Sequence, residues 1–580
     1  MSGDDRAAPP SWQALVPGIA VLRGYRREWL GKDIVSGLVL SALLVPQGMA
    51  YAELANLPPV TGLYTSILCL IGYAIFGPSK VLVLGPDSAL GSMIAATIVP
   101  LLLADGDPAR AIALSSVLAI LVGVIMVVAG LAKFGFIADL LSKPTQIGYM
   151  NGLALTIVIS QLPKLLGFSI DAEGLLREVG AVLTGIVQDA ANVTAAIIGL
   201  ASLAGILLLN RLLPKLPSVL IVVVLTAIAV NIFDLGGHGV DTIGVLPQGF
   251  PPFTLPIVRW SDLPVLMLGA VAIAVVALAD TMSTASAFAA RRGERVQGNQ
   301  EMVGIGAANI AAGFFQGFPV STSGSRTAVA EQAGSRSQVT GLVGAAVITV
   351  LLVFATSLMQ YVPQPTLGAI VIAAAFSLAD LPATRRLWQQ RRMEFALSVI
   401  ALLGVAFLGV LPGIVIAVAL SILNVFRRTW WPYQAELGKT PDRAGLHDLT
   451  RYPNAAVLPG LVVYRFDAPL IFANARMFSE AIRGLHDRSG DLRWIVIAAE
   501  PVTDVDTTAA DMLEELDAWL NERSVSLVFA ELKDPVREKI ERYGLTRTID
   551  PAHFFPTLDA ALEQYVRETG ATWRRTEPDT

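Results

Sequence analysis

Two short segments decide the fold of this chain: Gly85-Pro86-Asp87-Ser88-Ala89-Leu90 and Ser323-Gly324-Ser325-Arg326-Thr327-Ala328. Each has a glycine that permits a tight backbone and a short polar side chain that can cap a helix, so each predicts a helix start. Both nevertheless lie inside strongly apolar sequence, about 240 residues apart. A bilayer tolerates such interruptions only where the backbone is buried in protein or lines a cavity. A matching pair indicates the solute-binding site of a transporter.

Apolar segments recur from about Ile34 to Phe426, and several reach the roughly 20 residues that span a bilayer. The mean hydropathy is +0.61 and only 15% of the residues are charged. We therefore predict a polytopic α-helical membrane protein whose transport domain covers residues 34–428. It is expected to have 14 spans, two of them short, at 34–54, 61–77, 87–100, 111–132, 145–166, 193–210, 217–232, 263–288, 299–315, 325–333, 338–360, 366–378, 394–410 and 412–427.

Basic residues are distributed unevenly between the predicted connections. If the N-terminal segment 1–33 is cytoplasmic, the cytoplasmic connections hold 13 Lys and Arg residues and the opposite ones hold four, Arg110, Lys164, Arg177 and Arg259. The positive-inside rule then places both termini in the cytoplasm. The first apolar segment has no convincing cleavage site at its end. We therefore expect an uncleaved, multi-pass protein of the cell (inner) membrane.

The composition changes after residue 428. A linker at 429–444 is predicted to lead into a soluble α/β domain at 445–570, followed by a C-terminal tail at 571–580. Short apolar runs alternate with amphipathic ones, which is typical of a sheet covered by helices. The strands are expected at 461–466, 469–473, 494–498 and 526–530, and the helices near 475–485, 508–520, 535–542 and 557–567.

The second interruption carries an arginine, Arg326. An arginine at the centre of a membrane helix costs roughly 2.5–3.5 kcal/mol to insert, so an ionisable group there is functional by default. The free N–H groups of a helix N-terminus also attract anions. Two such N-termini that face each other near the midplane, with Arg326 as a full charge, would hold an anion. The alternative is that both segments are ordinary kinks and that Arg326 snorkels or pairs with an acid.

The first interruption carries a carboxylate, Asp87, which would repel an anion beside it. This carboxylate either caps its helix and faces away, or it is protonated or paired with a cation during transport. The sequence does not choose between these alternatives.

Four further polar residues in the spans are candidates for the same cavity or for ion coupling. Asp280 ends an apolar run, and Thr284 lies one helical turn later on the same face. Asp280 could accept a proton, could bind Na⁺ together with the Thr284 hydroxyl, or could pair with Arg326. Gln47 and Tyr51 are also one turn apart, and they could line the cavity.

Several classes of function lack support in the sequence. Cys69 is the single cysteine and lies in an apolar run, so neither a disulfide nor a cysteine metal site is expected. The four histidines are scattered and lie far from the interruptions. No nucleophile is arranged with a base. We therefore expect no enzyme, no cofactor and no nucleic-acid partner, and the expected ions are co-transported H⁺ or Na⁺.

Motifs along nearly the whole chain resemble the SulP family of sulfate permeases, in the family's order. The motifs are Pro46-Gln47-Gly48-Met49-Ala50-Tyr51-Ala52, Leu57-Pro58-Pro59-Val60-Thr61-Gly62-Leu63-Tyr64-Thr65-Ser66, Phe76-Gly77-Pro78-Ser79-Lys80, Gly298-Asn299-Gln300-Glu301 and Ser325-Arg326-Thr327-Ala328. Downstream, the segment 464–474, Tyr-Arg-Phe-Asp-Ala-Pro-Leu-Ile-Phe-Ala-Asn, resembles the start of that family's cytoplasmic STAS domain.

The resemblance implies a fold and a mode of transport. The 14 segments would form two inverted repeats of seven, divided into core and gate domains, with half-helices at segments 3 and 10. Transport would proceed by elevator-like alternating access in a homodimer. The residues expected to bind the substrate are Gln47, Tyr51, Asp87, Ser88, Ser325, Arg326 and Thr327.

The resemblance also gives a coupling role to Asp280, which falls where relatives carry the acidic residue linked to H⁺ or Na⁺. Sodium-dependent bicarbonate members are similar in having Asp with Thr four residues later, as in Asp280 and Thr284. Plant-type sulfate carriers have Glu at that position. Both the coupling ion and the anion therefore stay open.

In the STAS domain, Asp504-Val505-Asp506-Thr507-Thr508-Ala509 resembles the turn that kinases phosphorylate in bacterial anti-sigma antagonists. Thr507 would be the phospho-acceptor, although threonine replaces serine and alanine replaces glycine. A regulatory role for Thr507 is one interpretation, and an N-cap for the following helix is the other.

The leading hypothesis is a secondary active transporter of small inorganic anions, with sulfate ahead of bicarbonate. Dicarboxylate transport by the same machinery is the nearer alternative. A membrane-anchored anion sensor that signals through the STAS domain is an alternative of a different class. A nucleobase carrier would share the fold, but Arg326 and the STAS domain argue against it.

Overall fold

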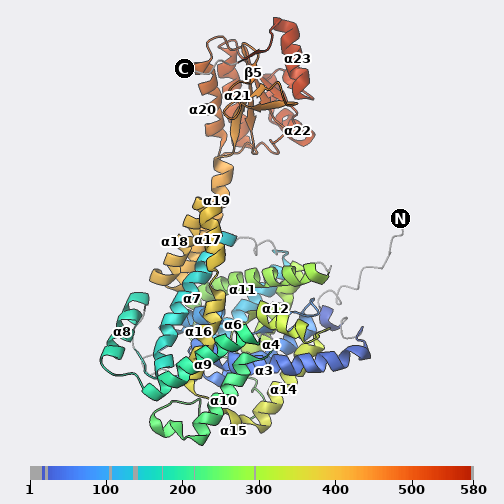
Figure 1. Ribbon diagram of the computed structural model, residues 1–580. Helices are drawn as coiled ribbons and strands as arrows, with labels where there is room; N and C mark the ends of the chain where they lie inside the picture. Colours follow the sequence, from blue (N-terminus) through green and yellow to red (C-terminus); the bar gives the residue numbers. More distant parts are fainter. Residues whose placement is uncertain are drawn as a thin grey trace. The chain divides into compact units, whose positions relative to one another are not determined.

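The computed structural model describes residues 16–19, 24–102, 107–134, 142–170, 172, 174–213, 216–292 and 296–575. The chain divides into two compact units at the boundary between Ser421 and Ile422. The first unit is helical, and the second is built around a β-sheet (Figure 1).

A helix coincides with each of the 14 predicted spans. These helices are α3 (Leu30–Leu54), α4 (Pro59–Phe76), α5 (Ser88–Ile98), α6 (Pro108–Leu131), α7 (Lys143–Leu166), α9 (Val193–Leu212), α10 (Ser218–Ile232), α11 (Leu263–Arg292), α12 (Gly298–Phe314), α13 (Gly324–Gln332), α14 (Val339–Phe354), α16 (Gln364–Leu378), α18 (Arg392–Leu408) and α19 (Val410–Trp430). Among the described residues, seven helical segments are long and apolar enough to cross a membrane. The sequence did not predict α8 (Leu175–Val187) or α17 (Leu381–Gln390), and the predicted span 338–360 is divided into α14 and the short helix α15 (Thr356–Met359).

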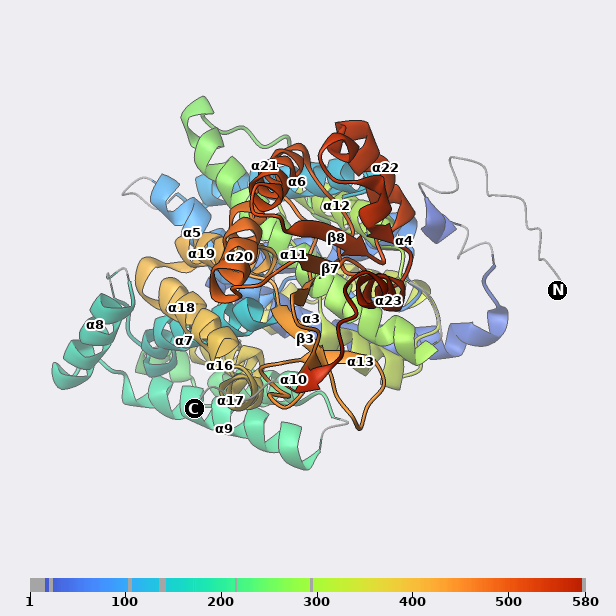
Figure 2. The ribbon, with the colours of Figure 1, turned by 90° about the horizontal axis from the view of Figure 1, so that it is seen from above.

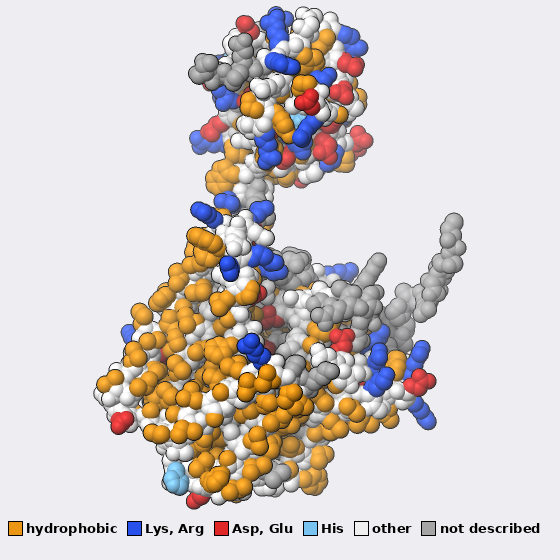
Figure 3. Space-filling model, viewed as in Figure 1, with side chains coloured by type: hydrophobic (Ala, Val, Ile, Leu, Met, Phe, Trp, Pro, Cys, Tyr) orange, Lys and Arg blue, Asp and Glu red, His pale blue; other side chains and the backbone are white. Residues whose placement is uncertain are grey.

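The surface of the first unit is strongly apolar. Figure 3 shows hydrophobic side chains covering much of its visible face. Large side chains such as Leu208, Leu225, Phe354 and Leu408 are more than half exposed. A soluble protein rarely exposes apolar patches of this extent. The exposed surface is therefore suited to contact with lipid, and the protein is a polytopic membrane protein.

The helices of the first unit pack in two groups. The core group consists of α3 to α6 and α11 to α14, in which α12 packs on α4 and α6, and α14 packs on α3 and α4. The gate group consists of α7, α9, α10, α16, α17 and α18. Corresponding pairs recur in the two halves of the chain, because α3 packs on α14 as α11 packs on α6. The packing is therefore that of two repeats of seven helices. Each repeat contributes helices to both the core group and the gate group.

The two interrupted segments meet inside the core group. Strand β1 (Leu84–Gly85) pairs antiparallel with β2 (Ser321–Thr322), and a helix starts directly after each strand. The Asp87 carboxylate caps α5 by accepting a hydrogen bond from the Ala89 N–H at 2.9 Å. The Ser323 hydroxyl caps α13 by accepting one from the Arg326 N–H at 3.5 Å. The predicted helix starts are therefore present, and they lie side by side.

Close approach of α3 and α4 depends on glycine. A Cβ added at Gly62 would lie 1.9 Å from the backbone oxygen of Gly48, a distance that only a shift of one helix can relieve. We expect Gly62→Ala to destabilise the protein by about 3 kcal/mol, the upper end of what overpacking costs. The measurement is heat-induced loss of monodisperse protein in detergent.

The matched control is Gly180→Ala in α8, where an added Cβ meets nothing within 4 Å. Alanine at this position should raise stability slightly, because glycine inside a helix costs roughly 0.5–1 kcal/mol relative to alanine. Equal stability losses in the two variants would contradict the packing argument.

The second unit has an eight-stranded sheet in the order β10-β5-β3-β6-β7-β8-β9, with β4 paired to β3. The strands β6 to β9 are parallel, and β3 is antiparallel to β6. Figure 2 shows α20 (Ala475–Arg488), α21 (Thr507–Asn521) and α22 (Asp534–Tyr543) on one side of the sheet and α23 (Leu558–Thr569) on the other. The strand bounds are Gln434–Lys439 (β3), Leu446–Asp448 (β4), Ala456–Val457 (β5), Leu461–Phe466 (β6), Trp494–Ala498 (β7), Ser526–Ala530 (β8), Phe554–Phe555 (β9) and Arg574–Arg575 (β10).

Alternating side chains of β7 fill two separate cores. Ile495 and Ile497 pack with α20, α21 and α22, whereas Trp494 and Val496 pack with α23. A strand that is apolar on both faces is typical of a parallel sheet between helices. The α/β arrangement predicted for this unit is therefore present.

Three details of the second unit differ from the sequence prediction. The predicted linker 429–444 contains β3, which belongs to the sheet, because Ala435 and Leu437 face its core. The predicted tail contains β10, which pairs with β5; residues 576–580 lie outside the described residues. The predicted strand 469–473 is only a single bridge between Leu470 and Val505.

Candidate anion site

A cavity of about 780 Å³ lies between the two helix groups. Its walls come from α3, α9, α10, α13 and α16, and it runs along α13 from Ser325 and Arg326 to Gln332 and Ala333. Arg326 is the one charged residue among those that line it. The other polar side chains on its wall are Gln47, Tyr51, Asn210, Ser218, Ser325, Gln332 and Ser377.

The guanidinium of Arg326 is buried and incompletely hydrogen-bonded. The residue is 2% exposed, and its Nη1 donates to the Pro86 carbonyl at 2.6 Å. Its Nε and Nη2 have no hydrogen-bond partner among the described residues. No ion pair of Arg326 is found among the described residues, so the predicted alternative of a pairing with Asp280 is not observed. A buried cation with unmet donors is costly unless an acceptor fills the site.

This guanidinium lies against Gly85, the last residue of β1. A Cβ at Gly85 would lie 3.5 Å from Cζ and Nη2 of Arg326 and 3.0 Å from Leu44 Cδ2. The arginine of the second repeat therefore packs directly against the interrupted strand of the first. This arrangement brings a full positive charge between the N-termini of α5 and α13, where free N–H groups also favour anions.

Four of the predicted binding residues line the cavity: Gln47 and Tyr51 from α3, and Ser325 and Arg326 from α13. Tyr51 is 5% exposed, and its hydroxyl interacts with the side chain of Ser88. The Ser325 hydroxyl lies 3.1 Å from that of Ser323. The i, i+4 spacing on α3 thus turns both Gln47 and Tyr51 toward the same space.

The other three predicted binding residues, Asp87, Ser88 and Thr327, are not among the residues that line this cavity. Asp87 caps α5, which is one of the two roles that the sequence left open for it. Ser88 is buried at the first position of α5. The Thr327 hydroxyl accepts a hydrogen bond from the Val83 N–H at 3.1 Å, so it joins α13 to the segment before β1.

Asp280 and Thr284 lie on α11, next to the start of α13. A Cβ at Gly324 would lie 3.8 Å from the Thr284 hydroxyl. Asp280 accepts a hydrogen bond from Gln146 Nε2 at 3.4 Å, and Gln146 belongs to α7 in the gate group. Neither Asp280 nor Thr284 lines the cavity of Arg326. Within the described ranges, no cluster of three His, Cys, Asp or Glu residues could hold a metal ion.

Two residues near Asp280 were not predicted from the sequence. Gln146 crosses from the gate group to the carboxylate. Tyr149 lies one turn later on α7, and its fully buried hydroxyl has no hydrogen-bond partner in the described ranges. Both lie among other polar residues, Thr145 and Asn151, in the first part of α7. Nothing in their spacing marks them as neighbours of a residue about 130 positions away.

In the second unit, Thr507 is the first residue of α21, and its side chain is exposed. The cap is Asp506, whose Oδ1 accepts from the Ala509 N–H at 2.8 Å and whose Oδ2 accepts from the Phe472 N–H at 2.7 Å. The helix is thus capped without the threonine hydroxyl. Phosphorylation of Thr507 stays a prediction.

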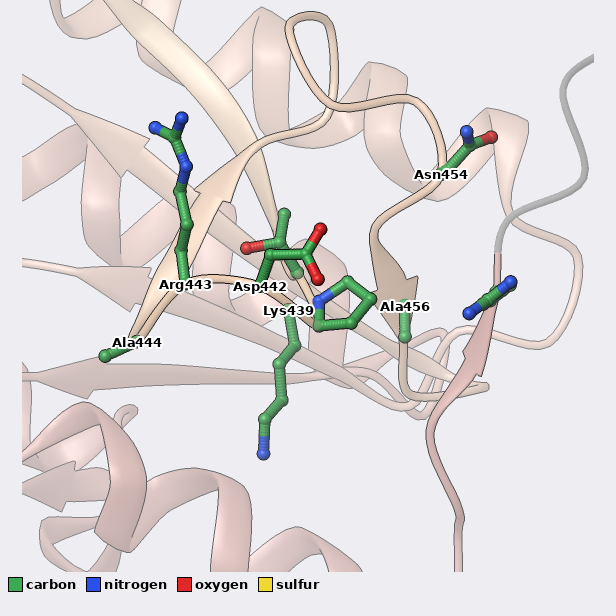
Figure 4. A pocket seen from close by; sticks show the side chains of 9 residues that line it. Lys439, Asp442, Arg443, Ala444, Asn454 and Ala456 are labelled. Atoms are coloured by element: carbon green, nitrogen blue, oxygen red, sulfur yellow. The ribbon is translucent and has the colours of Figure 1, made fainter.

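A shallow hollow in the second unit contains Lys439, Asp442, Arg443 and Arg575. Figure 4 shows the side chains of Lys439 and Arg443 pointing in opposite directions, with the Asp442 carboxylate between them. Lys439 Nζ instead lies over the ring of Trp573, 5.4 Å from its centroid. The basic side chains of this hollow do not point toward a common position. The hollow therefore does not resemble the anion site at Arg326.

Comparison with known proteins places the two units in separate domain families. Residues 30–401 match the sulfate permease family, and residues 452–561 match the STAS domain. A probable sulfate transporter of Mycobacterium tuberculosis strain H37Rv is 40% identical over 552 residues, which cover 95% of this chain and 98% of the relative. Probable sulfate transporter 3.3 of Arabidopsis thaliana is 30% identical over 543 residues, covering 89% of this chain and 85% of the relative.

Two solved structures share the fold. The murine Solute Carrier 26 family member A9 anion transporter in the inward-facing state gives a TM-score of 0.89 at 24% identity, over 98% of this chain and 96% of that one. The transmembrane domain of a cyanobacterial bicarbonate transporter, BicA, gives a TM-score of 0.58 at 20% identity, over 69% of this chain and 98% of that one. At these identities the likeness concerns the fold alone.

Proposed function

The chain belongs to the sulfate permease family, and we propose that it is an ion-coupled secondary transporter of small inorganic anions. The family consists of transporters rather than enzymes, and anion transport across a membrane is the activity common to the relatives named above. The anion, the coupling ion and the elevator movement are the parts that we add as proposals.

The observation that carries the proposal is the buried, partly unbonded guanidinium of Arg326. Within the part of the chain that the structure describes, its Nε and Nη2 face no acceptor, and no acidic side chain lines the cavity. A planar guanidinium presents paired N–H groups that match oxyanions. An anion that enters the cavity would therefore receive charge-assisted hydrogen bonds from Arg326 and further donors from Ser325, Gln47 and Tyr51.

Sulfate is the first expected substrate and bicarbonate the second. Two relatives with 30% identity or more are named sulfate transporters, and a divalent oxyanion gains more than a monovalent one from a fixed positive charge. The structural likeness to a bicarbonate transporter concerns the fold and keeps bicarbonate as the alternative. A dicarboxylate would also present an oxyanion to Arg326, so it stays a candidate of the same class.

The orientation of the cavity supports alternating access. Its far end is formed by Asn210, Leu216 and Pro217 at the α9–α10 connection and by Ala333 after α13. Basic residues cluster near this end, including Arg211 and Arg336. The positive-inside rule assigns such an end to the cytoplasm. We therefore propose that this conformation is open to the cytoplasm, and that the core group slides along the gate group to reach the outside.

The same rule supports cytoplasmic termini in the inner membrane. The homodimer implied by the family resemblance is a further proposal. The candidate site depends neither on the cytoplasmic location of the termini nor on the homodimer, because its residues all come from a single chain.

Uptake into proteoliposomes tests the proposal. Purified protein should take up sulfate along an imposed H⁺ or Na⁺ gradient, with saturation as the sulfate concentration rises. Bicarbonate, chloride and fumarate are tested in parallel, each with either gradient or with none. Saturable uptake of fumarate but not of sulfate would favour the dicarboxylate alternative. Binding of an anion without flux of any anion would favour a sensor and contradict transport.

A further inference from the structure

An ion pair joins the two helix groups close to the anion site. Lys164 Nζ lies 3.1 Å from Glu53 Oε2. Glu53 is in the last turn of α3, in the core group, and Lys164 is in the last turn of α7, in the gate group. The Glu53 side chain is 9% exposed and that of Lys164 is 32% exposed. The pair is therefore largely shielded from solvent, where the attraction between charges is stronger than at an open surface.

The position of this pair separates two hollows. Tyr51, which lines the cavity of Arg326, is two residues before Glu53 on α3. On the other side, a hollow of about 290 Å³ is lined by Glu53 and Lys164 together with Asn56, Pro108 and Gln364. The segment before Pro108, which joins α5 to α6, is on the non-cytoplasmic side in the proposed topology. The end of α3 and its ion pair thus form the barrier between the cavity and the outside.

We propose that Glu53 and Lys164 form an outer latch, which holds the transporter closed to the outside while its cavity is open to the cytoplasm. This inference rests on the proposed function in one respect, the sliding of the core group along the gate group. Because the two charges belong to different groups, that movement has to separate them. Glu53 and Lys164 are positioning residues, since neither lines the anion cavity. Loss of either charge shifts the resting protein toward the outward-open state.

Reporter cysteines measure this shift directly in purified protein in proteoliposomes. In a Cys69→Ala background, Gln364→Cys reports on the outer hollow and Ser377→Cys reports on the cavity. A membrane-impermeant maleimide is applied from one side at a time, without any anion substrate. With Glu53→Gln or Lys164→Gln, labelling at position 364 should become on the order of tenfold faster, and labelling at position 377 correspondingly slower. A shift of this size lies between the effects of exposed and buried ion pairs.

Two further variants separate the latch from a general loss of stability. The exchange Glu53→Lys with Lys164→Glu should restore both labelling rates. The matched control is Arg110→Gln, which breaks an ion pair with the same 3.1 Å spacing to Asp262. Arg110 and Asp262 both lie within the core group or directly before its helix α11, so their loss should leave both labelling rates unchanged.

Unchanged labelling in Glu53→Gln, or an equal change in Arg110→Gln, would overturn the latch. Because labelling needs no substrate, the latch can be tested apart from the identity of the anion. A protein that shows the labelling shift but transports no anion would retain the latch and lose the proposed function.

Discussion

Replacing Arg326 by alanine is expected to abolish anion binding and uptake while the protein stays folded. Two nitrogens of the guanidinium, Nε and Nη2, have no partner in the described part of the chain, and hydrogen bonds to charged groups are worth about 1.5–3 kcal/mol each. Losing two of them corresponds to roughly 10²–10⁴-fold weaker binding at about 1.4 kcal/mol per factor of ten. Equilibrium binding of radiolabelled sulfate and uptake into proteoliposomes measure the loss.

Stability separates this effect from misfolding. The variant removes a buried cation whose donors are partly unmet, and its one hydrogen bond, to the Pro86 carbonyl, is a modest loss by comparison. We therefore expect the thermal midpoint without anion to stay the same or to rise. The added stabilisation by sulfate, which depends on binding to the native state, should disappear. Arg326→Lys retains the charge without the planar fork and should bind with intermediate affinity. If Arg326→Ala took up anions at the wild-type rate, the assignment of Arg326 to the anion site would be wrong.

Replacing Asp280 by asparagine is expected to leave anion binding nearly intact and to remove its dependence on the coupling ion. Asp280 lies outside the anion cavity but contacts Gln146 of the gate group. A coupling between two sites is typically worth 1–3 kcal/mol, or roughly 5–150-fold. Gradient-driven uptake should therefore fall by roughly 5–150-fold, whereas the dissociation constant for sulfate measured without the coupling ion should change little. Counterflow of labelled sulfate, which needs no gradient, is the readout for the carrier itself.

Two comparisons sharpen this experiment. Asp280→Glu retains a carboxylate and should keep some ion dependence. Thr284→Val removes the hydroxyl one turn away, so it should change a sodium dependence but spare a proton dependence. An Asp280→Asn protein whose uptake still rises fully with the imposed gradient would exclude Asp280 from coupling.

The membrane fold was largely predictable because most of the spans are apolar over most of their length. The missed helix α17 shows the limit of that signal. Its sequence contains Arg385 and Arg386, a composition that is typical of a polar connection between spans. The helix forms because Asp380 caps it by accepting from the Ala383 N–H at 2.8 Å, and because Ala383 and Leu387 pack on Ile147. A tertiary contact of this kind has no trace in local composition.

In the second unit, the apolar composition of residues 469–473 predicted a strand that the structure does not contain. Pro469 has no N–H to donate to a ladder. The Asn474 side chain accepts from the Ile471 N–H at 3.0 Å and donates to the Pro469 carbonyl at 2.9 Å. These local bonds hold the segment as a turn before α20. The missed strand β3 did carry a signal, the alternation of Ala435 and Leu437.

The candidate site was predictable in part. Arg326 was identifiable because a charge in an apolar segment is rare, and Gln47 and Tyr51 because they are one turn apart. The cap role of Asp87 could only be offered as one of two alternatives, since the direction of a side chain depends on the backbone at the helix start. Gln146 could not be found, because its hydrogen bond to Asp280 joins two helices, α7 and α11, that are far apart in the sequence.

The pairing of β1 with β2 has a consequence for the energetics of a transport cycle. Besides this pairing, the Ser323 N–H donates to the Val83 carbonyl at 3.1 Å, and Arg326 reaches across to Pro86. The N-terminal ends of α5 and α13 are thus hydrogen-bonded to each other, and both belong to the core group. The proposed sliding of the core group along the gate group would therefore not separate them. A bound anion would meet the same donors at either membrane face, so its intrinsic affinity would be nearly equal on both. Net movement would follow the two concentration gradients, as in any secondary transporter, and the affinity of the site would favour neither face.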